Sequence, residues 1–178
     1  MIDKKFVFVD FNNSERKETL IDKFIEELQI IIVSSLNNGE FYNYFAFTGN
    51  SCLRLIYKED DKFLKDLEFV TFNNKEYKHD YESYFSYMKS TFEALGIKCR
   101  IYEDATKEQL LKTFSFQFDY KNLIECFGLE QYKNYFKDDE VLEIKLMLNL
   151  KINKELEVEV IENDFPLYQV NCIKRSNI

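Results

Sequence analysis

Two stretches of strict alternation constrain the fold of this chain more than any other feature of its sequence. In residues 113–120 (TFSFQFDY) every second side chain is aromatic, and in residues 141–152 every second side chain is Leu or Ile. A period of two is the pattern of a β-strand with one buried face. We interpret the aromatic stripe as core rather than as a base-stacking platform. Such platforms place solvent-facing aromatics beside basic residues, whereas the opposite face here carries Ser115, Gln117 and Asp119.

Shorter periodic segments complete an α+β pattern. Apolar residues at helical spacing predict helices at residues 14–36, 52–57 and 79–95. Strand-like composition or alternation predicts strands at residues 5–11, 42–47, 66–72, 97–102 and, last in the chain, 156–161. Helices come early and strands dominate late, without an internal repeat or a linker. The sequence therefore predicts a single domain, residues 1–178, with a mixed or antiparallel sheet flanked by helices.

Composition and charge argue against several classes of protein. The 178 residues carry a formal net charge of −8, and 46% of them are apolar. A uniformly basic nucleic-acid binder is not expected, because phosphate neutralisation needs clustered Lys and Arg. No run approaches the roughly 20 apolar residues of a membrane-spanning helix, so a membrane partner is not expected. The apolar content also argues against disorder of the whole chain.

The cysteines and the single histidine indicate the compartment and argue against a zinc site. The four cysteines lack C-x-x-C spacing, and each lies in a mostly apolar stretch: Cys52, Cys99, Cys126 and Cys172. We interpret them as buried free thiols, which indicates a reducing, cytoplasmic location. His79 is the only histidine, and a surface role is expected for it. One histidine with scattered cysteines does not favour structural zinc.

The segment 45–72 carries the residue types that bind a phosphorylated ligand. Gly49 allows a sharp turn after a strand and a close approach of the backbone to a ligand. The helix that follows offers N–H groups to a phosphate, and Ser51 adds a hydroxyl there. Asp66 and Glu68 are two residues apart on a strand, so both carboxylates leave the same face. Such a pair beside a phosphate cradle suits Mg²⁺, which binds one or two carboxylates together with substrate phosphates.

This segment, FTGNSCLRLIYKEDDKFLKDLEF, resembles the signature of the AbiEii/AbiGii-type nucleotidyltransferases. These are toxin components of abortive-infection and toxin–antitoxin systems, in the DNA polymerase β-like nucleotidyltransferase superfamily. Their pattern is Gly-Gly-Thr-Ala-Leu, then a helix and a loop, then Arg-Phe-Ser-x-Asp-Leu-Asp-Phe. The matching positions are Gly49, Ser51, Leu53, Phe63, Asp66 and Glu68. The order of elements in the family also fits the whole chain.

The resemblance implies a metal-dependent nucleotidyltransferase that uses Mg²⁺ or Mn²⁺. It would transfer a nucleotide from a nucleoside triphosphate to an RNA, such as tRNA, or to a protein acceptor. The resemblance implies that Asp66 and Glu68 bind the metal. The residues it implies for holding the triphosphate are Gly49, Asn50, Ser51 and Lys62. It also implies a cognate antitoxin, and a basic partner would suit this acidic chain.

The chain departs from the family pattern at several positions. Asn50 stands for the second Gly, Lys62 for Arg, Leu64 for Ser, and Glu68 for the second Asp. The family takes a third carboxylate from a later strand, in a Lys-x-Glu or Lys-x-Asp context. The local match is Lys145-Leu146-Met147, which lacks the carboxylate, and Glu143 is the alternative third ligand or base. The helical domain that follows the last strand in the family is expected to be absent here.

These departures leave a second function open, a catalytically inactive nucleotidyltransferase fold kept as a binding or regulatory module. Each half of the motif also has an ordinary interpretation. Residues 49–51 suit a capped strand-to-helix turn, and Asp66 and Glu68 suit a solvated strand face. The flanking Arg54, Lys58, Lys62 and Lys65 are triphosphate or acceptor ligands in the first interpretation and exposed charges in the second.

Overall fold

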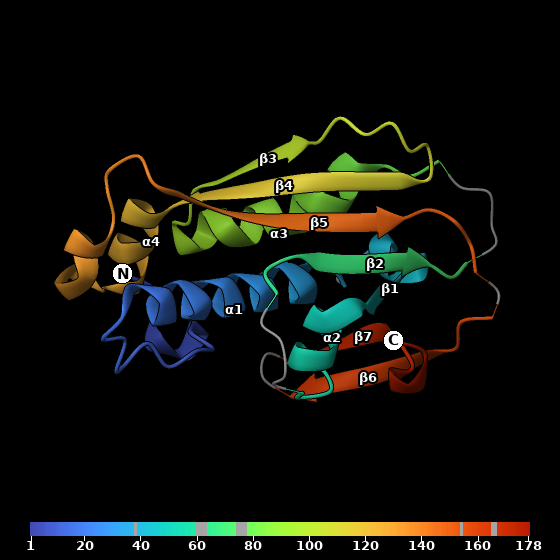
Figure 1. Cartoon of the computed structure of the whole chain (residues 1–178), viewed down its shortest axis with the longest axis horizontal. Helices are drawn as coiled ribbons and strands as arrows, with labels where there is room; N and C mark the ends of the chain where they lie inside the picture. Colours follow the sequence, from blue (N-terminus) through green and yellow to red (C-terminus); the bar gives the residue numbers. More distant parts are fainter. Residues whose placement is uncertain (38, 60–63, 74–77, 154, 165–166) are drawn as a thin grey trace.

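The sheet has seven strands and is mixed, so the predicted α+β class is confirmed (Figure 1). The computed structural model describes residues 1–37, 39–59, 64–73, 78–153, 155–164 and 167–178. The strands are β1 (Phe45–Thr48), β2 (Leu67–Thr71), β3 (Cys99–Glu103), β4 (Leu111–Asp119), β5 (Val141–Asn149), β6 (Val158–Asp164) and β7 (Leu167–Ile173). Their order across the sheet is β3-β4-β5-β2-β1-β7-β6. The β2/β5 and β1/β7 pairs are parallel, and the other pairs are antiparallel.

Among the described residues, the α-helices are α1 (Lys17–Leu36), α2 (Gly49–Leu55), α3 (Tyr81–Leu95) and α4 (Tyr120–Phe127). The helix α3 begins at a local cap, because the Asp80 side chain accepts a hydrogen bond from the Ser83 amide at 3.2 Å. It ends at Leu95, and the next residue is Gly96, whose left-handed backbone is typical of a helix stop. None of the described helices is both long and apolar enough to span a bilayer.

The two alternating stretches form the neighbouring strands β4 and β5. They pair antiparallel over nine residues, with Phe116 opposite Ile144. The predicted core faces are buried in both strands: Phe114, Phe116, Phe118, Leu142, Ile144, Leu146 and Leu148. The interpretation of the aromatic stripe as core is therefore confirmed. Leu150 lies beyond the end of β5 and is half-buried.

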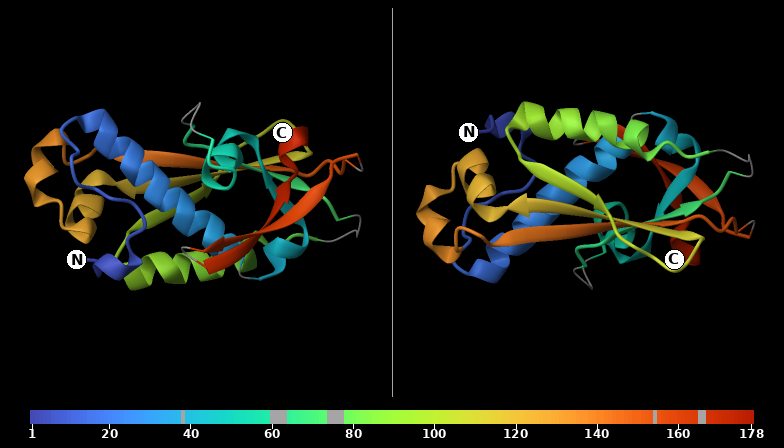
Figure 2. Two further views of the ribbon diagram at one scale, coloured as in Figure 1. Left: turned by 90° about the horizontal axis from the view of Figure 1, so that it is seen from below. Right: turned by 90° about the horizontal axis from the view of Figure 1, so that it is seen from above.

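The helix α3 lies along one face of the sheet (Figure 2). It packs on β4 through aromatic edge-to-face contacts. The Phe85 ring lies 4.9 Å from that of Phe114, and the Phe92 ring lies 5.3 Å from that of Phe118. Such contacts are worth roughly 1 kcal/mol each beyond the area they bury. The opposite face of β4, β5 and β2 is here called the outer face. It carries the half-buried side chains that alternate with the core.

Two sequence predictions about elements and one about a single residue were wrong. Residues 5–11 form no strand, and Lys4–Phe6 is instead a short 3-10 helix. The predicted last strand is followed by β7, which inserts between β1 and β6. His79 is half-buried rather than on the surface, and its Nδ1 lies 2.9 Å from the Tyr84 hydroxyl. The cysteines are free thiols, as predicted, although Cys99 is only half-buried.

Candidate functional site

The carboxylate of Glu68 lies against the turn between β1 and α2. The β1/β2 register places Glu68 opposite Thr48, the residue before Gly49. Gly49 has a φ of +76°, in the left-handed region that favours glycine. A Cβ atom at Gly49 would lie 2.7 Å from Glu68 Oε2 and 2.9 Å from its Cδ. The missing side chain of Gly49 therefore makes the space that the Glu68 carboxylate occupies.

Asp66 lies immediately before β2, with its side chain directed to β5. Its Oδ1 accepts a hydrogen bond from the Lys145 amide at 3.2 Å. Leu67 and Phe69 are buried, whereas Asp66 and Glu68 are half-buried. Because strand side chains alternate, the two carboxylates leave the outer face together. The structure thus brings Gly49, Asp66 and Glu68 to one corner, where the other oxygen of Asp66 and the carboxylate of Glu68 suit a hard cation.

Ser51 has a different environment from the one expected of a phosphate ligand. It is 2% exposed, and its hydroxyl faces the Leu64 and Asp66 carbonyl oxygens at 3.1 and 2.5 Å. The single hydroxyl proton is therefore used inside the protein. Ser51 holds the loop that leads into β2, while Asn50 beside it is half-buried.

The third position of the predicted carboxylate set is filled by a methionine. The parallel β2/β5 register places Met147 opposite Glu68 and Leu146 opposite Leu67. Glu143 is four residues before Met147, about 13 Å along the strand from the level of Glu68. Its Oε2 accepts a hydrogen bond from Gln117 Nε2 at 3.2 Å. The structure therefore does not bring Glu143 together with Glu68.

Of the basic residues near the motif that the structure describes, Arg54 and Lys58 contact other groups of the protein. Arg54 Nη1 lies 3.7 Å from Glu26 Oε2 on α1, and the Arg54 side chain is only 12% exposed. Lys58 Nζ donates a hydrogen bond to the Leu55 carbonyl oxygen at 2.7 Å. Lys65 is exposed. Lys62 lies outside the described residues, so its predicted role in triphosphate binding stays a prediction.

Hydrogen bonds and ion pairs tie the rest of the outer face. Lys145 Nζ lies 3.4 Å from Asp104 Oδ2, and Asp104 Oδ1 accepts a hydrogen bond from the Ser115 hydroxyl at 2.7 Å. At the edge strand, Arg100 and Asp119 form a bidentate pair at 3.0 and 2.9 Å. This Arg100 guanidinium holds the pKa of Asp119 below its usual range. The outer face is thus polar and of mixed charge.

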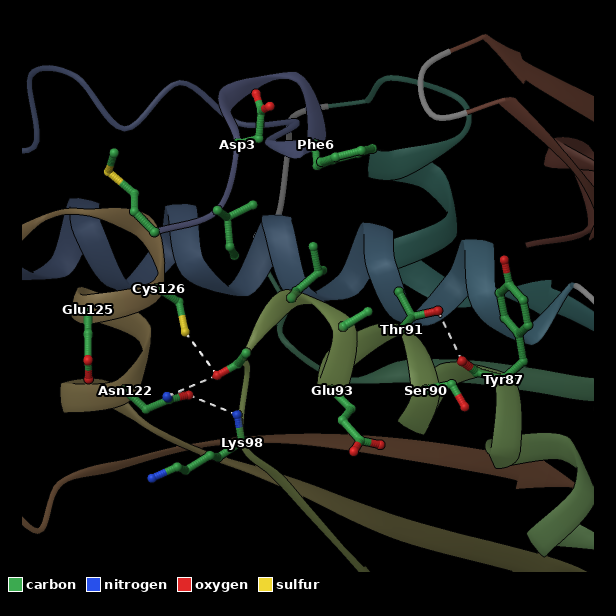
Figure 3. A pocket seen from close by; sticks show the side chains of 15 residues that line it. Asp3, Phe6, Tyr87, Ser90, Thr91, Glu93, Lys98, Asn122, Glu125 and Cys126 are labelled. Atoms are coloured by element: carbon green, nitrogen blue, oxygen red, sulfur yellow. Dashed lines mark hydrogen bonds between the residues drawn. The ribbon is translucent and has the colours of Figure 1, made fainter.

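A cavity of about 1080 Å³ lies away from this corner (Figure 3). The N-terminal segment, the second half of α3 and one side of α4 line it. In this cavity Cys126 and Asn122 point toward Gly96, and both side chains donate to its carbonyl oxygen. None of the predicted site residues lines it. The candidate site is therefore an open corner of the sheet, not this cavity.

Asp66 and Glu68 are the two acidic side chains that the structure brings to this corner. In the part of the chain that the structure describes, no three His, Cys, Asp or Glu side chains gather as a metal-binding group. Comparisons with known protein families, with curated proteins and with solved structures find no match to this chain. Function is therefore inferred from the arrangement of Gly49, Asp66 and Glu68.

Substitution of Gly49 tests the close approach of Glu68. Gly49→Ala is expected to lower the free energy of unfolding about 2 kcal/mol more than Gly96→Ala, because overpacking adds to backbone strain. Gly96 is the matched control. It also has a φ of +76°, but a Cβ there would meet only Cys126 Sγ at 3.8 Å. Urea unfolding of both variants measures the difference. Adding Glu68→Ala should remove it, and equal losses in the two single variants would contradict the contact.

Proposed function

We propose that this chain is a metal-dependent nucleotidyltransferase of the toxin–antitoxin or abortive-infection type. It would transfer a nucleotide from a nucleoside triphosphate to an RNA, such as tRNA, or to a protein acceptor. One observation carries the proposal. The Glu68 carboxylate lies in the space left by Gly49, and Asp66 leaves the same face two residues earlier. The resemblance of segment 45–72 to the nucleotidyltransferase signature gives this corner its chemistry.

Each residue at the corner has a definite task in this proposal. Asp66 and Glu68 would hold Mg²⁺ or Mn²⁺, and the ion would supply positive charge to the triphosphate. In the transfer, a bond would form from the acceptor hydroxyl oxygen to the α-phosphorus, the bond to the bridging oxygen of the β-phosphate would break, pyrophosphate would leave, and the hydroxyl proton would be released to solvent. The backbone amides of Gly49 and Asn50, in the first turn of α2, have no intrahelical partners and would donate to the anionic oxygens of the triphosphate.

The experiment is incubation of the chain with labelled nucleoside triphosphates, Mg²⁺ or Mn²⁺, and total RNA or candidate protein acceptors. Label transferred to a macromolecule supports the proposal. A chain that neither transfers label nor binds Mn²⁺ with any of the four triphosphates contradicts it. Co-purification from the native host would identify the acceptor and a cognate antitoxin.

A second candidate function is a catalytically inactive module that binds nucleotide or protein. Met147 favours it, since it lies opposite Glu68 where the family supplies its third carboxylate. Two carboxylates suffice to bind one cation with substrate phosphates, whereas transfer with two metal ions needs more negative charge. Calorimetry separates the candidates. Mg²⁺-dependent binding of a triphosphate without transfer favours the inactive module.

Restoring the missing carboxylate should raise metal affinity. Met147→Asp is expected to increase Mn²⁺ affinity about tenfold, because second-sphere and ligand changes commonly alter metal affinity by that factor or more. Met147 is half-buried on the outer face, so the new carboxylate does not enter the core. The matched control is Asn149→Asp, which adds the same charge two residues further along the face. Paramagnetic resonance of free Mn²⁺ measures both, and equal gains would indicate general charge attraction instead.

A further inference from the structure

The loop that leads into β2 is held from α1 by one buried amide side chain. Gln29 is fully buried, and its Nε2 donates hydrogen bonds to the carbonyl oxygens of Leu64 and Lys65 at 3.0 and 2.9 Å. Both N–H groups of the amide are thus used. Burying an amide without hydrogen-bond partners costs free energy. These two bonds therefore account for a glutamine on the buried side of α1.

The same loop is held from α2. The Ser51 hydroxyl faces the carbonyl oxygens of Leu64 and Asp66, so side chains contact three consecutive carbonyl groups. Arg54 on α2 then fixes Gln29 itself, because its Nη2 donates to Gln29 Oε1 at 3.1 Å. Figure 1 shows β2 starting beside α1. The network therefore joins α1, α2 and the residue that begins the acidic motif.

We propose that Gln29 is a positioning residue for the carboxylates of Asp66 and Glu68. This inference rests on the proposed function, since it assumes that the two carboxylates bind a cation. The Asp66 side chain is held by the Lys145 amide on β5, while its own carbonyl oxygen is held by Ser51 on α2. Gln29 fixes the two residues before it. The backbone that aims both carboxylates is thus set before β2 begins, and it needs no rearrangement when the cation binds.

The test is the Mn²⁺ affinity of the full chain carrying Gln29→Met. Methionine has a similar length and suits a buried position, but it cannot donate to the Leu64 and Lys65 carbonyl groups. We expect the affinity to fall about tenfold. Amide hydrogen exchange in a peptide covering residues 64–70 should become faster at the same time. Ser51→Ala, which removes the hydrogen bonds from α2, should act in the same direction and serves if Gln29→Met folds poorly.

Two controls separate positioning from general destabilisation. Gln169→Met makes the same change at an exposed position of β7 and should leave both measurements unchanged. Phe92→Leu weakens the core between α3 and β4, so it should lower the melting temperature but not the Mn²⁺ affinity. If the wild-type chain binds Mn²⁺ and Gln29→Met binds it with the same affinity, the inference about Gln29 is overturned. The proposed function is not affected by that result. A wild-type chain that binds no Mn²⁺ overturns the proposed function, and this inference with it.

Discussion

The Asp66→Asn variant is expected to keep its fold and to transfer nucleotide at least about a hundredfold more slowly than the wild type. Loss of a metal-binding carboxylate removes several kcal/mol of charge stabilisation from the transition state, and each 1.36 kcal/mol is a factor of about ten. Asparagine is preferred to alanine because its carbonyl oxygen can still accept the hydrogen bond from the Lys145 amide. The substitution therefore removes the charge and spares the local structure.

Glu143→Gln is the matched control for this experiment. It neutralises another carboxylate of the outer face, and the new amide oxygen can still accept from Gln117. Glu143 lies about 13 Å along β5 from the level of Glu68. The transfer rate of the Glu143→Gln variant should therefore stay within about twofold of the wild-type rate. Unfolding curves of both variants confirm that they are folded. Transfer unchanged by Asp66→Asn would refute the role of Asp66, and a large loss in Glu143→Gln would make Glu143 the third ligand.

Periodic segments with a buried face could be predicted from the sequence alone. The strands β4 and β5 and the helices α1 and α3 each repeat their apolar side chains at one clear period, and each was placed within a few residues. Segments without a clear period could not be placed in this way. Residues 5–11 are rich in Phe and Val, but the Phe8 and Val9 amides donate to the side chain of Glu27 on α1 and not to a neighbouring strand.

Other elements were missed because tertiary pairing decides them. The seven-residue strand β7 pairs with both β1 and β6 and is not predicted, although Asn163, Asp164 and Pro166 before it are typical turn residues. The helix α4 follows β4 without a break, so the alternation up to Tyr120 conceals its start. Its one local signal is Gly128 directly after its end, a helix-stop residue that the sequence does carry.

The site was predictable in its local part and not in its long-range part. Gly49, Asp66 and Glu68 lie close in sequence, at the adjoining ends of the antiparallel neighbours β1 and β2, so their spacing was enough to predict that they meet. Met147 and Glu143 come from a strand that pairs with β2 in parallel, and a register across so long a connection cannot be counted from one sequence. The hydrogen bonds of the Ser51 hydroxyl could not be predicted, because its acceptors are backbone carbonyl groups, which every residue has.

Glu27 is a buried carboxyl group, and the helical pattern of α1 did not reveal that it is buried. It is fully buried, and its carboxylate accepts hydrogen bonds from the Phe8 amide at 3.1 and 2.9 Å and from the Val9 amide at 2.9 Å. These bonds tie the N-terminal segment to α1. Burial raises the pKa of Glu27 to about 7, although the hydrogen bonds from Phe8 and Val9 oppose the shift.

The raised pKa of Glu27 predicts that the wild-type protein loses stability as the pH rises. The pKa of Glu27 in the folded protein is above its ordinary value of 4.5, so the folded state holds a proton that the unfolded state has released. The stabilisation is complete below pH 4.5 and is lost as pH rises through about 7. Its magnitude is about 3 kcal/mol between pH 4.5 and 8, at 1.36 kcal/mol per pKa unit.

Glu27→Gln should abolish this dependence, because glutamine is neutral like the protonated acid and its amide oxygen can accept from the Phe8 and Val9 amides. Urea unfolding of both proteins from pH 4.5 to 8 gives the difference, in which all other titrating groups cancel. The variant should match the wild type at pH 4.5 and exceed it by about 3 kcal/mol at pH 8. Glu18→Gln, an exposed change on the same helix, should keep the wild-type profile. A constant difference across this range would mean that Glu27 is ionised throughout, and that the two amides outweigh its burial.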